Sequence, residues 1–286
     1  MKPALNPVDD QIVRRGWPDK PILAVCEFAT VAILFWADVH HHIFISKTLY
    51  LFPLAWFSLR VRGLRWRDVG LARFRSWRTT LLIGLAAGVT LEAFELFISQ
   101  PLLIRIIGKP PDLSDFPSTR GHVGLLLLWI LLIWTLGASG EEMVYRGYLM
   151  NRVADLMRGT RTSWIVSLLA VSIVFGAAHL GQGITGQVEN MIDGFLLGAL
   201  YLGCGRNLAV AIVAHGVTDT IDFLLIFAGL YPTLRLNPSS TQREARPLPA
   251  AGTQLKPRVT PNLSRNVLDT ITASPSIQST MCAELS

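Results

Sequence analysis

Charged side chains are scarce in this chain of 286 residues: Asp, Glu, Lys and Arg make up 16% of it, against 51% hydrophobic residues. A soluble globular domain carries about a quarter charged residues, so this composition argues against a soluble fold. Several stretches hold almost no charge, and each approaches the roughly 20 apolar residues that cross a bilayer. The net charge is +6, and the basic residues lie between these stretches, where Lys and Arg set the orientation in the membrane. No separate basic domain is present, which argues against binding of nucleic acid.

The sequence also lacks several familiar signatures. Its cysteines, Cys26, Cys204 and Cys282, form no CxxC pair, which argues against a zinc knuckle or a disulfide framework. No HExxH motif occurs, so the signature of the soluble zinc proteases is missing. The first apolar run starts at Pro21, contains Glu27 and is followed by no small-residue cleavage site, so we expect it to stay as a membrane segment.

The apolar runs predict membrane helices, because lipid leaves backbone polar groups no partner outside the helix. We expect an all-α, polytopic bundle of about seven to eight transmembrane helices. The candidate spans are residues 22–39, 43–59, 80–98, 123–145, 163–180, 188–203 and 207–229. The chain is then divided into an N-terminal segment (1–21), N-terminal membrane helices (22–122), a membrane core (123–231) and a disordered polar tail (232–286).

The segment 60–79 carries the strongest orientation signal. It holds seven arginines and a single acid, which predicts that it is cytoplasmic. Alternate crossing of the membrane then places 1–21 and the arginine-bearing segment 146–162 on the same side. The basic tail falls on the opposite side, in mild conflict with the same rule, although long tails obey it poorly.

Two adjacent acids, Glu141 and Glu142, follow the apolar run Leu125–Ala138. An ionisable residue in a membrane helix costs roughly 2.5–3.5 kcal/mol on insertion scales, so each calls for a reason. Glu142 and Arg146 are four residues apart with the acid first, the favourable order for a helical ion pair. Glu141 points about 100° away from Glu142 in an α-helix, which leaves it free for chemistry. The alternative is a charged helix end that only sets topology.

Two histidines lie in similar apolar surroundings. Phe175 and His179 share a helix face, and the small residues between them permit close helix packing. His215 and Asp219 likewise share a face, with Asp222 about one turn further along. Each histidine could also be a satisfied interhelical group. The His215–Asp219 pair fits a buried ion pair, a pair of metal ligands, or a carboxylate that orients an imidazole.

The spacing predicts that Glu141 and His179 lie at one depth. Glu141 precedes the turn near Thr160 by nineteen residues and His179 follows it by nineteen, so antiparallel helices of equal rise bring them level. A Glu and two His can activate water as a general base and stabilise the resulting oxyanion. They can instead bind zinc, with Glu141, His179 and His215 as the ligands, since two His and one carboxylate are a common catalytic set.

Together these motifs resemble the CPBP family of intramembrane proteases, which includes the CAAX prenyl endopeptidases and the bacterial Abi or bacteriocin-immunity-like proteins. The family pattern is EExxxR, then FxxxH, then HxxxN or HxxxD, on separate membrane helices. In this chain the motifs are, in order, Glu141-Glu142-x-x-x-Arg146, Phe175-x-x-x-His179 and His215-x-x-x-Asp219. The resemblance covers about residues 123–229. It implies a multi-pass integral protein of the bacterial inner (plasma) membrane, with 123–231 as its catalytic core.

The resemblance further implies a CAAX-protease-like endopeptidase, of glutamic or metallo type, that cleaves membrane-associated substrates. The catalytic residues it implies are Glu141, His179, His215 and Asp219. The supporting residues it implies are Glu142, Arg146 and Phe175. In the family, Glu141 with His179 activates the water, and the positions of His215 and Asp219 form the oxyanion hole. The prenyl endopeptidases typically carry Asn at the last position, whereas Asp219 donates a hydrogen bond only when protonated, so we expect it to orient His215.

Two other functions fit parts of the pattern. A non-catalytic membrane scaffold or bacteriocin-immunity factor could retain the motifs for stability. A transporter could use Glu27, Glu92 and Glu95 with Glu141 as a proton relay, although these acids also fit paired or snorkelling residues in short helices. The expected partners are membrane lipids and a peptide or protein substrate, with no nucleic acid, and zinc is the one cofactor that the residues suggest.

Overall fold

The computed structural model describes residues 21–40, 42–43, 46–72, 75–114 and 116–232. Within these ranges the chain is helical and contains no strand, so the all-α prediction is confirmed. The segments 1–20 and 233–286 lie outside the described residues, and with them the N-terminal segment placed in the cytoplasm, the predicted polar tail and Cys282. Arg73 of the arginine-rich segment also lies outside them.

The helices follow the apolar runs closely. The α-helices are α1 (Pro21–Val39), α2 (Lys47–Val61), α3 (Trp77–Phe94), α4 (Gln100–Ile107), α5 (Val123–Leu132), α6 (Asn151–Leu156), α7 (Arg161–Ala177), α8 (Gly183–Gly203) and α9 (Leu208–Ala228). Two π-helical stretches join neighbours into longer rods: η3 (Glu95–Ser99) joins α3 to α4, and η5 (Ile133–Met150) joins α5 to α6. Short 3₁₀ turns are η2 (Trp66–Val69), η4 (Pro117–Thr119) and η6 (Leu180–Gln182).

Polar side chains set the starts of several helices by accepting hydrogen bonds from otherwise unpaired backbone N–H groups. Ser76 accepts from Thr79 N at the start of α3, and Asn207 accepts from Val210 N at the start of α9. Helix α9 ends at Gly229, whose φ of 66° is the left-handed conformation that glycine adopts at helix C-termini. These caps fix the ends of the helices that carry the functional side chains.

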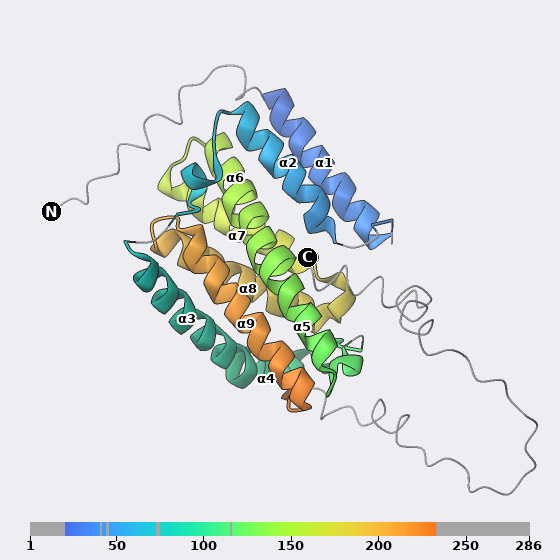
Figure 1. Ribbon diagram of the computed structural model, residues 1–286. Helices are drawn as coiled ribbons and strands as arrows, with labels where there is room; N and C mark the ends of the chain where they lie inside the picture. The colour runs from blue at the N-terminus through green and yellow to red at the C-terminus, as the bar shows by residue number, and fades with distance from the viewer. Residues whose placement is uncertain (1–20, 41, 44–45, 73–74, 115, 233–286) are drawn as a thin grey trace, which may run out of the picture.

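The rods lie side by side in the order α1, α2, η5, α9 and α3, with α7 and α8 paired behind them (Figure 1). Many large apolar side chains on the outer faces are exposed, such as Phe57 at 58%, Leu82 at 67% and Ile173 at 59%. Exposed apolar surface on this scale marks contact with a membrane, and helices satisfy their own backbone within lipid. The protein is therefore an integral membrane protein.

Four continuous helical segments of the described chain are long and apolar enough to cross a membrane: Ile22–Val39, Trp77–Ile107, Val123–Leu156 and Leu208–Ala228. Helices α7 and α8 meet at a bend of 63° and count as a fifth span if taken together. Helix α2 has 15 residues, fewer than the roughly 20 that cross the hydrocarbon core. Seven helical units thus occur where seven runs were expected, but the number of about seven to eight full spans is not confirmed.

Candidate active site

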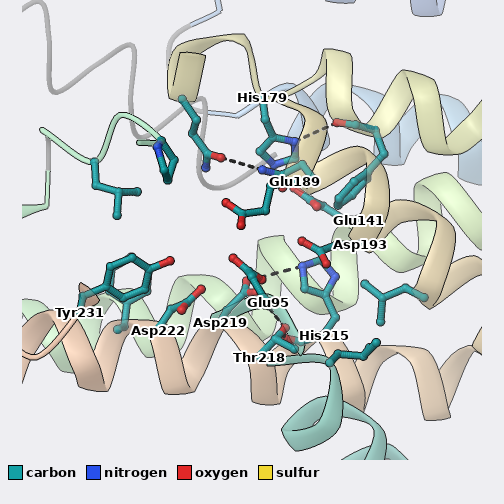
Figure 2. Close-up of a pocket in the computed structure, with 18 of the residues that line it drawn as sticks. Glu95, Glu141, His179, Glu189, Asp193, His215, Thr218, Asp219, Asp222 and Tyr231 are labelled. Atoms are coloured by element: carbon teal, nitrogen blue, oxygen red, sulfur yellow. Dashed lines mark hydrogen bonds and ion pairs between the residues drawn. The ribbon is translucent and has the colours of Figure 1, made fainter. Parts of the chain in front are cut away.

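A cavity of about 100 Å³ lies between η3, η5, the α7–α8 turn and α9. Figure 2 shows the polar side chains that surround it, and they come from segments far apart in the sequence. All the predicted catalytic side chains, Glu141, His179, His215 and Asp219, line this cavity. A polar space of this size has room for several water molecules.

The two adjacent acids point to different surroundings, as their spacing predicted. Glu142 is fully buried and its Oε1 accepts from Arg146 Nη1 at 2.6 Å and lies 2.9 Å from His215 Nδ1. Glu141 is 2% exposed, and its Oε1 has no hydrogen-bond partner among the described residues. Both acids lie in the π-helical stretch η5 instead of the α-helix we expected. Such stretches are frequent at functional sites, and this one re-aims the side chains that follow it.

Arg146 ties three helices together around the site. Besides the ion pair with Glu142, its Nη2 donates to the carbonyl oxygen of Gly194 in α8 at 3.0 Å. Its guanidinium also lies 4.7 Å from the centre of the Phe175 ring in α7. A planar guanidinium suits this combination of donation to two separate acceptors and stacking on a ring, which a lysine would not reproduce.

His179 lies two residues beyond the end of α7, the helix that was expected to contain it. Its Nδ1 is 2.8 Å from the carbonyl oxygen of Phe175. A carbonyl oxygen only accepts, so Nδ1 carries the proton, and the lone pair of the neutral ring is on Nε2. His179 is 4% exposed and lines the cavity, where that lone pair can accept a proton or a hydrogen bond.

The small residues before His179 permit the close packing that the sequence predicted. A Cβ atom added at Gly176 would lie 2.4 Å from the backbone oxygen of Gln187, closer than any real contact. A Cβ added at Gly194 would lie 3.2 Å from the Phe175 side chain. Helices α7 and α8 therefore touch through their backbones, and this contact brings the acids of α8 beside His179.

His215 stands between two carboxylates. Its Nδ1 faces Glu142, and its Nε2 lies 3.5 Å from Asp219 Oδ2. Thr218 donates to the backbone oxygen of His215 at 2.7 Å and to Asp219 Oδ1 at 3.3 Å. The carboxylates on both sides restrict the orientation of the ring, and carboxylate–imidazole pairs of this kind orient a functional histidine elsewhere.

Lys47 is a buried cation that the sequence reasoning missed. Its Nζ donates to Asp38 Oδ2 at 2.8 Å and to the backbone oxygen of Ala178 at 2.9 Å. Ala178 directly precedes His179, so the lysine links the N-terminal helices to the turn that carries this histidine. Inserting a lysine into a membrane helix costs free energy, so Lys47 in its apolar run could have been predicted to bind a buried partner.

Glu189 and Asp193 are further cavity residues that the motifs did not include. They are four residues apart on α8, so they share a helix face, and they are the only charged residues of this helix. The free-energy cost of inserting an acid into a membrane, which drew attention to Glu141, applies equally to Glu189 and Asp193. The same argument could have predicted that they have a function. With Glu95 and Asp222, they make the cavity wall strongly acidic (Figure 2).

The proposed zinc set can be compared with this geometry. Among the described residues, the group of three whose ligand atoms all lie within 4.8 Å of one another is Glu92, Glu95 and Asp222, and not Glu141, His179 and His215. In addition, both ring nitrogens of His215 face carboxylates of the protein. The ligand atoms of Glu141, His179 and His215 do not all lie within 4.8 Å of one another, so we derive no step through zinc, and a zinc ion at these residues stays a prediction.

Comparison with known families supports the motif assignment. Residues 123–221 match the family model of Rce1-like, type II CAAX prenyl endopeptidases. No match was found among curated proteins or among solved structures. The matched segment contains all the motifs from Glu141 to Asp219, and the expected resemblance to the CPBP and CAAX protease family is confirmed. Residues 123–221 of this chain are therefore similar to the Rce1-like, type II CAAX prenyl endopeptidases.

Proposed function

We propose that this protein is an intramembrane endopeptidase that hydrolyses peptide bonds of membrane-associated, CAAX-like substrates with a water activated by Glu141 and His179. One observation carries the proposal: Glu141, whose Oε1 has no hydrogen-bond partner among the described residues, and His179, whose Nδ1 is held by the carbonyl oxygen of Phe175, line the same buried cavity. Two acceptors beside one wet space are the requirement for holding a nucleophilic water.

The donors and acceptors define the orientation of that water. A water molecule has two O–H groups, and it can donate one to Glu141 Oε1 and the other to His179 Nε2. Its lone pairs then point away from both side chains, towards the carbonyl carbon of a bound peptide. Glu141 takes the proton as the oxygen attacks, and passes it to the departing amine when the C–N bond breaks.

The negative charge that forms on the carbonyl oxygen needs a donor from the protein. We assign this donor to Nε2 of His215, because Glu142 holds Nδ1 at 2.9 Å whereas Asp219 Oδ2 lies 3.5 Å from Nε2. Arg146 in turn holds Glu142 through the ion pair at 2.6 Å. In this scheme Asp219 acts on the oxyanion only through His215, because an ionised carboxylate has no hydrogen to donate.

The transporter alternative is weakened by the position of Glu27. Its carboxylate is bound by Arg152 Nε at 2.5 Å and by the hydroxyl of Ser58, and it is not among the side chains that line the cavity. A proton relay from Glu27 through Glu95 to Glu141 would need these acids to share one path. The scaffold alternative is separated from the peptidase by experiment.

The test uses the purified full-length protein in proteoliposomes with a library of quenched fluorescent peptides carrying a membrane anchor. Wild-type protein should cleave a subset of the peptides, and Glu141→Ala and His179→Ala should each abolish cleavage. Leu82→Ala, on the exposed outer face of α3, serves as the matched control and should cleave normally. Full cleavage by both site variants would refute the assignment. If Glu141→Gln leaves a cellular phenotype of the protein intact, the scaffold is the better description.

A further inference from the structure

A second group of acids borders the cavity: Glu95 and Asp222 line it, and Glu92 lies next to them. Glu92 in α3, Glu95 in η3 and Asp222 in α9 place one carboxylate oxygen each within 4.8 Å of one another. Figure 2 shows Asp222 and Tyr231 at one end of the cavity, and Glu141, His179 and His215 at the other. The proposed hydrolysis uses none of these three acids.

The acids of this group lack donors that would stabilise their charge. Glu92 is 2% exposed, and both its oxygens are without a hydrogen-bond partner among the described residues. Asp222 Oδ1 is unpartnered in the same sense. Glu189, which is 4% exposed and lines the same cavity, has an unpartnered Oε1 and lies close enough to Glu95 and Asp222 to interact with their charges.

The surroundings supply little compensation. None of the described residues that line the cavity is Lys or Arg. The nearby amide of Gln100 donates to Tyr231 at 2.9 Å and more weakly to Glu189 at 3.4 Å. Several ionised carboxylates in such a place repel one another and have lost their hydration, and no cation among the described lining residues compensates for either cost. A proton shared between Glu92 and Asp222, or a bound cation, would remove this repulsion.

We propose that Glu92, Glu95 and Asp222 bind one hard divalent cation of the Mg²⁺, Mn²⁺ or Ca²⁺ class. Such ions take carboxylate oxygens at about 2.0–2.6 Å, so two oxygens on one ion lie at most about 5 Å apart. The observed limit of 4.8 Å for this group satisfies that geometry. An all-oxygen set favours these ions over zinc, which prefers nitrogen and sulfur donors in proteins.

Such a cation would also fix the local fold. Glu92 lies in the last turn of α3 and Glu95 begins the π-helical stretch after it, while Asp222 comes from α9, the helix packed along α3. One ion would therefore hold the irregular turn of the α3–η3–α4 rod against α9. This role is separate from peptide hydrolysis, so the site can be tested without any substrate.

The test is Mn²⁺ binding to purified full-length protein in detergent, followed by electron paramagnetic resonance, together with the thermal midpoint with and without Mn²⁺. We expect one saturable site and a midpoint raised by the ion. Glu92→Gln and Asp222→Asn should each weaken Mn²⁺ binding by more than about tenfold and abolish the shift, because each removes a ligand charge. Asp193→Asn is the matched control, because it lines the same cavity but is not in the group, and it should keep the site.

Three outcomes overturn the proposal. Wild-type protein that binds no Mn²⁺, with Glu92→Gln raising the thermal midpoint, would show a shared proton in place of the ion. An equal loss of binding in Asp193→Asn would show diffuse attraction to an acidic cavity. An unchanged Mn²⁺ affinity in properly folded Glu92→Gln and Asp222→Asn would place the ion elsewhere. Loss of peptidase activity in Glu141→Ala bears on none of these results, so the two proposals fail separately.

Discussion

Two regions of this protein bury acids inside a membrane bundle, and they treat them in opposite ways. Between α1, α2 and α6, Glu27 is bound by Arg152 at 2.5 Å and by Ser58, and Arg62 reaches Asp155 at 3.2 Å. Around the cavity, Glu141 keeps an unpartnered oxygen and no Lys or Arg is among the described lining residues. In the first region ion pairs join the helices. In the second region the acids have no cationic partner and can bind a water, a proton or a ligand.

The presence or absence of a cationic partner distinguishes acids that stabilise the fold from acids that can take part in chemistry. A buried carboxylate with an arginine partner is neutralised, so its removal leaves an unpaired cation and destabilises the fold. A buried carboxylate without one is a source of strain that folding alone does not explain, and unpaired groups of this kind cluster at functional sites. Glu142 belongs to the first class although it is adjacent to Glu141, because Arg146 and His215 bind it.

The comparison is tested most strongly by Glu141→Gln. The amide keeps the shape but cannot accept the proton of the water, so kcat should fall by about 10²- to 10⁴-fold. The thermal midpoint should stay the same or rise, because an unpartnered buried charge has been removed. Steady-state cleavage and thermal unfolding of the same preparation measure both effects. A large loss of stability with normal turnover would place Glu141 in the structural class.

Arg152→Met is the counterpart in the other region. It leaves Glu27 buried without its cation, so the free energy of unfolding should fall by about 3–5 kcal/mol, while the folded fraction keeps its kcat. In the double variant Arg152→Met/Glu27→Gln, the loss should be smaller than the sum of the two single changes, because the carboxylate left unpaired by the first change is gone. Additive losses would contradict the direct pairing of these residues.

Lys47 connects the two regions, since it binds Asp38 of α1 and the carbonyl before His179. Lys47→Met should lower kcat on the order of tenfold by loosening the turn that carries His179, with KM nearly unchanged. The pH profile of kcat should also shift, which a purely structural role would not produce. An unaltered profile with a loss only in thermal midpoint would assign Lys47 to the structural network.

Much of this arrangement could be predicted from the sequence because it is local. The Glu142–Arg146 pair, the Phe175–His179 contact and the His215–Asp219 pair all follow from four-residue spacing on a helix. The apolar runs located the helices, since lipid admits no other backbone structure. Helical rise alone predicted that Glu141 and His179 come close to each other, and both line one cavity.

The parts that could not be predicted depend on how each helix is rotated. A helix that is apolar on all sides has no polar face to fix its rotation, so the sequence does not show which of its acids turn inward. The π-helical stretch η5 adds a further change in phase that no residue pattern announced. The contribution of Glu189 and Asp193 to the cavity, and the reach of Lys47 to Ala178, arise only from tertiary packing.

The smallest effect is expected at Asp219, where the family typically carries Asn. In this structure Asp219 Oδ2 lies 3.5 Å from His215 Nε2, and Asp219 Oδ1 receives a hydrogen bond from Thr218. An asparagine can still accept from either neighbour, so Asp219→Asn should change kcat by no more than about threefold, whereas Asp219→Ala should lower it by about tenfold or more. Single-turnover cleavage at several pH values would measure both. A rise in kcat for Asp219→Asn well above wild type would show that the amide donates to the oxyanion directly. The side chain at this position would then be part of the oxyanion hole. Its role would depend on the hydrogen bond it donates, and not on whether its charge has a cationic partner.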